Sequence, residues 1–287
     1  MNKRAAIGLA FVLAIGGYIN TFLKGMVGLE RPFQSHSNEV KKIGSSEGYS
    51  FPSGHSQATG AFWTYSSLEI KERPTLNKLS RILFYMAAIS FLILVPLSRV
   101  YLGVHWPGDI LVGVFEGILI AILYFWAAPR VWIHLKELSD RTQIASAILV
   151  TILMAVSSTI ITSAFGHDAI IAANWELPGA LAGFSVGLIL EKRYVQFELP
   201  APDQLGKITL RLIIGLILLV VIYYGLKFAV SPFEGLEIIS GAEEANLMLL
   251  LDYIRLLIVG VAAAFGIPWV FLQIEEKLEI RQQMEAR

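Results

Sequence analysis

The stretch Ser98–Asp109, SRVYLGVHWPGD, decides how the rest of the chain is interpreted. It places an arginine, a histidine and an aspartate where one apolar run ends and the next begins, where a bare charge is costly and indicates a functional site. Pro107 suits the first position of a helix, and Asp109 falls in the first turn, where the helix dipole favours a carboxylate. The stretch therefore predicts a new helix with a polar site at its start.

Within this stretch, His105 and Asp109 are four residues apart. A carboxylate at that spacing can accept the proton of one imidazole nitrogen and leave the other nitrogen free as a nucleophile. Arg99 supplies a planar guanidinium that suits a phosphate or a carboxylate. Together the three side chains predict phosphate chemistry.

The composition is that of a membrane protein. The chain has 287 residues, 55% of them hydrophobic and 16% charged, with a mean hydropathy of +0.62; soluble domains carry about 25% charged residues. Lysine plus arginine and aspartate plus glutamate balance at 23 each, so the net charge favours neither nucleic acid nor an acidic partner. The absence of cysteine excludes disulfides, thiolate metal sites and cysteine catalysis.

Eight apolar runs are roughly long enough to cross ~30 Å of hydrocarbon. They are Ala5–Phe22, Gly54–Ile70, Ile82–Val100, Pro107–Ala127, Ile144–Phe165, Leu177–Leu190, Ile208–Ala229 and Leu247–Leu272. We therefore expect an all-α fold, a polytopic membrane helix bundle of about eight transmembrane helices. The first run is expected to be retained because no small-x-small cleavage site follows it. The second is the least apolar and rich in small residues, which suits a helix packed inside the bundle.

Lysine and arginine predict the orientation, because they concentrate in cytoplasmic segments. With the amino terminus inside, the inner segments carry Lys3, Arg4, Lys71, Arg73, Lys78, Arg81, Arg130, Lys136, Arg141, Lys192, Arg193, Lys207, Lys277, Arg281 and Arg287. The outer segments carry only Lys24, Arg31, Lys41, Lys42 and Arg99. This bias predicts that the Ser98–Asp109 stretch lies on the outer, non-cytoplasmic face.

Three short motifs are predicted to meet at that face. Lys24 and Arg31-Pro32 follow the first apolar run, Pro52-Ser53-Gly54-His55 opens the second, and Ser98–Asp109 joins the third to the fourth. Taken singly, each motif is usually structural: an interfacial anchor, a capped turn and a paired histidine. All three in this order at one membrane face are not explained by coincidence.

Each basic or capping residue has a physical role in such a site. Lys24, Arg31 and Arg99 can surround a phosphoryl group and neutralise the charge on its equatorial oxygens. Ser53 is a good N-cap and Gly54 permits close backbone approach, so the helix start can direct N–H groups at the same phosphate.

His55 follows directly and has a different role. An imidazole at this position can protonate a leaving oxygen and later activate water, as a general acid and then a general base.

The three motifs resemble the signatures of the type 2 phosphatidic acid phosphatase superfamily, membrane lipid phosphatases related to vanadium haloperoxidases and glucose-6-phosphatase. The resemblance covers roughly residues 19–117. It implies that His105 is the nucleophile that forms a phosphohistidine, Asp109 its orienting partner and His55 the acid and base. It further implies that the phosphate is bound by Lys24, Arg31, Ser53, Gly54 and Arg99. The family uses no metal or cofactor, so none is expected here.

We therefore expect residues 1–127 to form a phosphatase core and residues 128–287 to add C-terminal transmembrane helices, partly like the tail of some bacterial members. The charged segment at 129–143, which contains Trp132, is the candidate seam and is expected to form an interfacial amphipathic helix. The expected location is a bacterial inner (plasma) membrane, with the active site on the periplasmic or extracellular face.

The expected reaction is hydrolysis of a lipid phosphate or pyrophosphate at the outer leaflet, without nucleic acid as partner. A polyprenyl pyrophosphate is the first substrate hypothesis; phosphatidate, phosphatidylglycerophosphate and sphingoid phosphates present the same headgroup chemistry. One alternative is a catalytically inactive protein that binds or transports lipid phosphates. A haloperoxidase is disfavoured because eight apolar runs imply a substrate reached from the bilayer. The oligomeric state is not predicted.

Residues outside the motifs receive no catalytic assignment. His36 is expected to face solvent, and His134 and His167 are interpreted as loop or interface residues. Asp252 and Arg255, three apart near one end of the last run, can pair, and we interpret them as structural, snorkelling residues rather than as contacts to a lipid headgroup.

Overall fold

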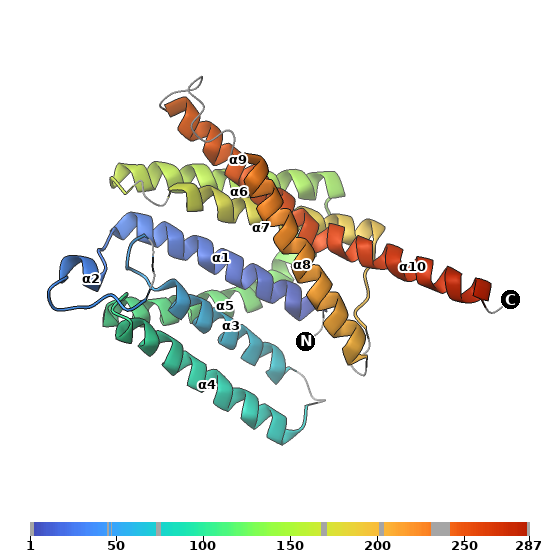
Figure 1. Ribbon diagram of the computed structural model, residues 1–287, viewed down its shortest axis with the longest axis horizontal. Helices are drawn as coiled ribbons and strands as arrows, with labels where there is room; N and C mark the ends of the chain where they lie inside the picture. The colour runs from blue at the N-terminus through green and yellow to red at the C-terminus, as the bar shows by residue number, and fades with distance from the viewer. Residues whose placement is uncertain are drawn as a thin grey trace. The chain divides into compact units, whose positions relative to one another are not determined.

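The computed structural model describes residues 3–44, 46, 48–72, 76–167, 171–200, 204–230 and 242–285, and every regular element within these ranges is a helix, as predicted (Figure 1). The helices are α1 (Lys3–Val27), α2 (Pro32–Ser35), α3 (Gly54–Lys71), α4 (Lys78–Tyr101), α5 (Pro107–Leu135), α6 (Asp140–Ala164), α7 (Ile171–Tyr194), α8 (Leu205–Val230), α9 (Ala242–Val261), the π-helical turn η3 (Ala262–Gly266) and α10 (Ile267–Glu285).

Each of the eight predicted apolar runs coincides with helical structure, and the last one extends through α9 and η3 into α10. Within the described ranges, six helical stretches have the length and apolar composition of a membrane span. The helices α3 and α7 contain 18 and 24 residues but are not among these six. The chain is thus an integral membrane helix bundle. All eight predicted runs are helical, but only six helical stretches of the described residues have the length and composition of a membrane span.

The chain divides into two compact units. The first comprises Met1–Glu137 and Val156–Asn174, and the second comprises Leu138–Ala155 and Trp175–Arg287. The first boundary falls inside the predicted seam at 129–143. The separate interfacial helix expected there does not form, because α5 continues through Pro129 to Leu135 and α6 begins at Asp140.

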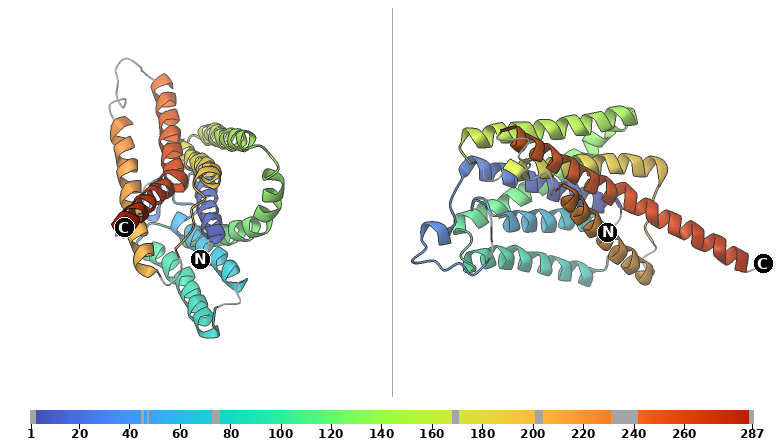
Figure 2. Two further views of the ribbon diagram at one scale, coloured as in Figure 1. Left: turned by 90° about the vertical axis from the view of Figure 1, so that its right-hand side faces the viewer. Right: turned by 45° about the horizontal axis from the view of Figure 1, so that its top comes forward.

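The helix α3 is the centre of the first unit. It packs against α1, α4 and α5, with α4 on the side opposite α1 (Figures 1 and 2). Close packing against α5 depends on Gly113 and Gly117, where a Cβ atom would lie 2.5 Å from the Ser53 carbonyl oxygen and 2.1 Å from that of Gln57. The least apolar run is therefore an interior helix, as its composition predicted.

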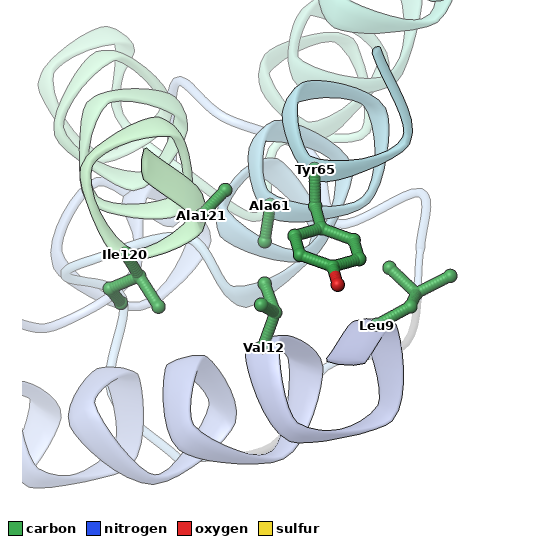
Figure 3. Packing of buried hydrophobic residues seen from close by; sticks show 6 residues of the cluster. All are labelled: Leu9, Val12, Ala61, Tyr65, Ile120 and Ala121. Atoms are coloured by element: carbon green, nitrogen blue, oxygen red, sulfur yellow. The ribbon is translucent and has the colours of Figure 1, made fainter. Parts of the chain in front are cut away.

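A small apolar core fixes α1, α3 and α5 together (Figure 3). It consists of Leu9 and Val12 from α1, Ala61 and Tyr65 from α3, and Ile120 and Ala121 from α5. The ends of these helices that carry the three motifs lie at one end of the first unit, where the segment after α1 also lies (Figure 1). The core therefore positions the motif residues relative to one another.

The second unit contains its own polar contacts. Arg255 of α9 forms ion pairs with Glu176 of α7 at 2.6 Å and with Asp252 at 2.9 Å, so the pairing of Asp252 with Arg255 that the sequence allows is present. The helix α8 packs against α9, η3 and α10.

Candidate active site

The His105–Asp109 pair lies at the junction of α4 and α5. His105 is 4% exposed, and its Nδ1 lies 3.4 Å from Oδ2 of Asp109. Its Nε2 lies 3.3 Å from Nη1 of Arg31, and a guanidinium can only donate hydrogen bonds. We therefore assign the ring proton to Nδ1, which donates to Asp109, and the lone pair to Nε2. This is the tautomer that a nucleophilic Nε2 requires.

Asp109 is held by more than the histidine. Its Oδ2 accepts a hydrogen bond from the backbone N–H of Trp106 at 2.8 Å and another from the hydroxyl of Ser50. Asp109 is 1% exposed and Ser50 is completely buried. Three donors on one oxygen fix the carboxylate and, through it, the plane of the His105 ring.

Arg31 connects the segment after α1 to His105. Besides its contact with the imidazole, its guanidinium donates to the carbonyls of Gly48 at 2.9 Å, Tyr49 at 3.1 Å and Val104 at 2.8 Å. The side chain is 4% exposed. Arg31 therefore holds the backbone on both sides of the site while presenting a fixed positive charge beside Nε2.

Lys24 is engaged in the same segment. Its Nζ lies 2.8 Å from the Tyr49 carbonyl, 3.3 Å from that of Ser50 and 2.7 Å from that of Pro52. An ammonium group has three N–H donors, and these carbonyls can use all of them. Lys24 thus holds the loop that leads to α3 through its N–H groups. Its contribution to the site is mainly the electrostatic effect of its positive charge.

The start of α3 is capped as predicted. The Ser53 hydroxyl accepts hydrogen bonds from the N–H and the hydroxyl of Ser56 at 3.4 and 3.0 Å. The Ser53 N–H donates to the Asp109 carbonyl at 3.1 Å, which joins this helix start to α5. Gly54 is the first residue of the helix, where free N–H groups and the helix dipole favour an anion.

His55 and Arg99 complete the set predicted from the motifs. The His55 side chain is exposed, and the positive charges of Arg99, Arg31 and Lys24 act on it. Arg99 lies in the last turn of α4, and its Nε is buried without a hydrogen-bond partner among the described residues. A buried N–H left without a partner costs about 1–3 kcal/mol, so Arg99 retains donor capacity that an anion can use.

Burial lowers the pKa of His105 below its ordinary value. The hydrogen bond to Asp109 opposes this shift, and the charges of Arg31 and Lys24 reinforce it. Because this pKa lies below the ordinary histidine value of about 6.5, the imidazole is neutral at neutral pH and its Nε2 lone pair is available.

Two features of the site were not predicted. Ser50 reaches Asp109 from two residues before Pro52, and only its place beside the second motif could have pointed to it. Asn20 donates to Oε2 of Glu116 at 3.1 Å, and both side chains are buried between α1 and α5. A glutamate inside the apolar run at 107–127 was the signal in the sequence that could have predicted this second contact.

Within the described ranges, no group of three or more histidine, aspartate or glutamate side chains is placed to hold a metal ion.

Comparison with known proteins gives the family. Residues 5–133 match the PAP2 superfamily, and residues 175–279 match the transmembrane extension of PAP2 superfamily phosphatases. The chain therefore carries a PAP2 superfamily domain followed by a PAP2 transmembrane extension. The resemblance drawn from the three motifs is confirmed.

Three relatives show the range of activities found among similar proteins. The chain is 32% identical over 119 residues to phosphatidylglycerophosphatase B of Bacillus subtilis, which covers 40% of this chain and 55% of the relative. It is 33% identical over 122 residues to dolichyldiphosphatase of Saccharomyces cerevisiae, with 41% and 49% covered. It is 28% identical over 144 residues to lipid A 1-phosphatase of Rhizobium johnstonii, with 45% and 54% covered.

The chain thus spans about half the length of the curated relatives it matches. No solved structure matches it.

Proposed function

We propose that this protein is an integral membrane phosphatase that hydrolyses a lipid phosphate or a lipid pyrophosphate through a phosphohistidine intermediate. The observation that carries the proposal is the arrangement around His105, whose Nδ1 faces Asp109 while its Nε2 faces Arg31. The names of the three relatives indicate phosphatidylglycerophosphate, a dolichyl diphosphate and lipid A as their substrates. All three substrates are phosphorylated lipids, which supports a phosphorylated lipid as the substrate class here.

The first half-reaction transfers the phosphoryl group to the enzyme. Nε2 of His105 attacks the terminal phosphorus, an N–P bond forms, and the bond from that phosphorus to the leaving oxygen breaks; this oxygen belongs to the lipid alcohol in a monoester and is the bridging oxygen in a pyrophosphate. His55 donates its proton to that departing oxygen, which leaves as an alcohol or, from a pyrophosphate, as a lipid monophosphate. Asp109 stabilises the positive charge that develops on the His105 ring.

The second half-reaction releases phosphate. His55, now neutral, takes a proton from a water molecule, whose oxygen attacks phosphorus as the N–P bond breaks. Inorganic phosphate leaves, and both histidines return to their starting protonation states. The exposed position of His55 at the start of α3 supports this role, because the water must reach it from solvent.

The cationic residues stabilise the charge on the equatorial oxygens in both steps. Arg99, with a buried Nε that has no partner among the described residues, is assigned the direct phosphate contact. Lys24 and Arg31 supply positive charge and hold the adjoining backbone. The N–H group of Gly54, at the helix start that Ser53 caps, completes the phosphate site.

We further propose where this reaction takes place. The distribution of lysine and arginine supports a site on the outer face of a bacterial inner membrane, with all eight apolar runs crossing the bilayer. Residues 1–127 form the phosphatase core in this proposal, and residues 128–287 add transmembrane helices to it. Carrier-lipid pyrophosphates of the polyprenyl type fit an outward-facing site and are the first substrate to test.

Phosphate release from a panel of lipid substrates tests the proposal. The purified full chain would be assayed with polyprenyl pyrophosphate, phosphatidate and phosphatidylglycerophosphate, each with and without EDTA. We expect turnover of at least one lipid, unchanged by EDTA and lost in His105→Ala. A folded protein that binds these lipids without releasing phosphate would instead be the binding or transport protein considered above.

A further inference from the structure

His167 contacts the active-site region from outside the three motifs. It follows α6 directly, and the end of α6 lies beside the end of α1 within the first unit (Figure 1). Its Nδ1 lies 2.7 Å from the carbonyl oxygen of Gly25, to which it must donate because a carbonyl only accepts. Its ring packs on that of Tyr49, with 4.9 Å between the ring centroids.

Both contacts fall on residues that shape the phosphate site. Gly25 follows Lys24 in the last turn of α1, where carbonyl groups lack partners inside the helix. The Tyr49 carbonyl accepts hydrogen bonds from Lys24 at 2.8 Å and from Arg31 at 3.1 Å. His167 thus touches the helix end that carries Lys24 and the residue that joins Lys24 to Arg31.

The backbone directly after α1 leaves room for this histidine. Gly28 has a φ of +61°, a conformation that favours glycine, and a Cβ atom there would lie 2.0 Å from the His167 ring. A side chain at position 28 would therefore strain the end of α1 and displace the ring. The contact is built into the turn that leads from α1 to Arg31.

We infer that His167 is a positioning residue for the phosphate site. By fixing the end of α1 and the ring of Tyr49, it holds the loop at residues 48–53, here called the cradle loop, in the place where Lys24 and Arg31 bind its carbonyls. The inference rests on the proposed function. It also means that a residue beyond positions 5–133, the part that matches the PAP2 superfamily, helps to form the site.

Three substitutions separate the two contacts of His167. His167→Asn keeps an N–H donor near the position of Nδ1 but loses the ring, His167→Phe keeps the ring but loses the donor, and His167→Ala loses both. His134→Ala is the matched control, because His134 is exposed near the end of α5. Each variant would be assayed for kcat, KM, calorimetric binding of inorganic phosphate, and amide hydrogen exchange in the cradle loop.

We expect His167→Ala to lower kcat/KM about tenfold and to weaken phosphate binding by a similar factor, the size of one or two lost contacts. Exchange in the cradle loop should become faster. His167→Asn and His167→Phe should each recover part of both losses, and His134→Ala should behave like the unmodified protein.

A residue that only stabilises the fold would change protein yield and thermal unfolding but not the constants of the folded fraction. Wild-type kcat/KM and phosphate affinity in folded His167→Ala would therefore overturn the inference. If His167→Ala does not fold, unchanged constants in both His167→Asn and His167→Phe would overturn it equally. Absence of turnover in the unmodified protein would instead overturn the proposed reaction, and phosphate binding would still decide the role of His167.

Discussion

The hydroxyl of Ser50 donates a hydrogen bond to the same carboxylate oxygen of Asp109 that faces His105. Ser50 is completely buried, and its backbone N–H is fixed by the Leu29 carbonyl at 2.7 Å. The segment before α3 therefore orients the proposed catalytic pair, His105 and Asp109, from outside the third motif. Outer partners of this kind fix the ring orientation and the tautomer of a histidine.

Ser50→Ala tests this contact. We expect kcat to fall about tenfold with little change in KM, because the carboxylate loses one of three donors while the phosphate site keeps its cations. The measurement is steady-state phosphate release, with thermal unfolding to show that the fold is retained. Ser37→Ala, at an exposed position, is the control. An unchanged kcat would show that Trp106 and His105 alone suffice to orient Asp109.

Arg99→Lys tests the arginine assigned to the phosphate. Lysine keeps the charge but cannot form the bidentate fork, so we expect turnover to fall about 10²-fold with protein level unchanged. Arg130→Lys, at the exposed end of α5, should have no such effect. Near-wild-type activity in Arg99→Lys would remove Arg99 from the phosphate site.

The pH profile tests the protonation state of His105. Burial lowers its pKa, so the nucleophile stays neutral below the ordinary histidine value of about 6.5, and the acid limb of kcat/KM should lie below that pH. The hydrogen bond to Asp109 raises this pKa, so Asp109→Asn should move the acid limb to still lower pH while reducing turnover. The substrate titrates identically in both assays, so the difference between the profiles isolates the enzyme. A shift to higher pH in Asp109→Asn would contradict the assignment.

The helices and the meeting of the motifs were predictable from the sequence for simple physical reasons. Apolar runs long enough to cross a bilayer have to satisfy their backbone groups internally, so each became a helix. The spacing of His105 and Asp109 at a predicted helix start placed the imidazole beside the carboxylate. Small residues in the second run indicated an interior helix, and α3 is central in the first unit.

The contacts that join distant segments were not predictable. Lys24 was expected to donate to phosphate, yet its N–H groups lie on the carbonyls of residues 49, 50 and 52. That arrangement depends on the path of the loop after α1, which no periodic pattern encodes. The same holds for His167, since its contact with Gly25 spans 142 positions of the chain.

Cysteine labelling tests the orientation, and the chain suits it because it contains no cysteine. We expect a cysteine at Asn38, which is exposed between α2 and α3, to react with a membrane-impermeant maleimide in intact cells. One at Glu72, exposed at the opposite end of α3, should react only after the membrane is opened. The reverse pattern would place the site at the cytoplasmic face and point to cytoplasmic substrates.

Trapping of a phosphoenzyme tests the covalent step and separates it from direct attack by water. If His105 attacks phosphorus and His55 protonates the leaving oxygen, loss of either histidine should remove most turnover, but only the loss of His105 removes the acceptor. His105→Ala should therefore form no phosphoenzyme. His55→Ala should still become labelled from a substrate with a good leaving group, because such a group needs little protonation.

The stability of the label identifies the bond. A phosphoramidate on histidine should be labile in acid and stable in base, and quenching at the two extremes of pH distinguishes it from a phosphoester. Asp109→Asn should give an intermediate amount of label, because the imidazole is present but its Nδ1 proton has lost the carboxylate that faces it. Label on His105→Ala, or turnover in the unmodified protein that EDTA abolishes and a divalent metal restores, would exclude His105 as the nucleophile.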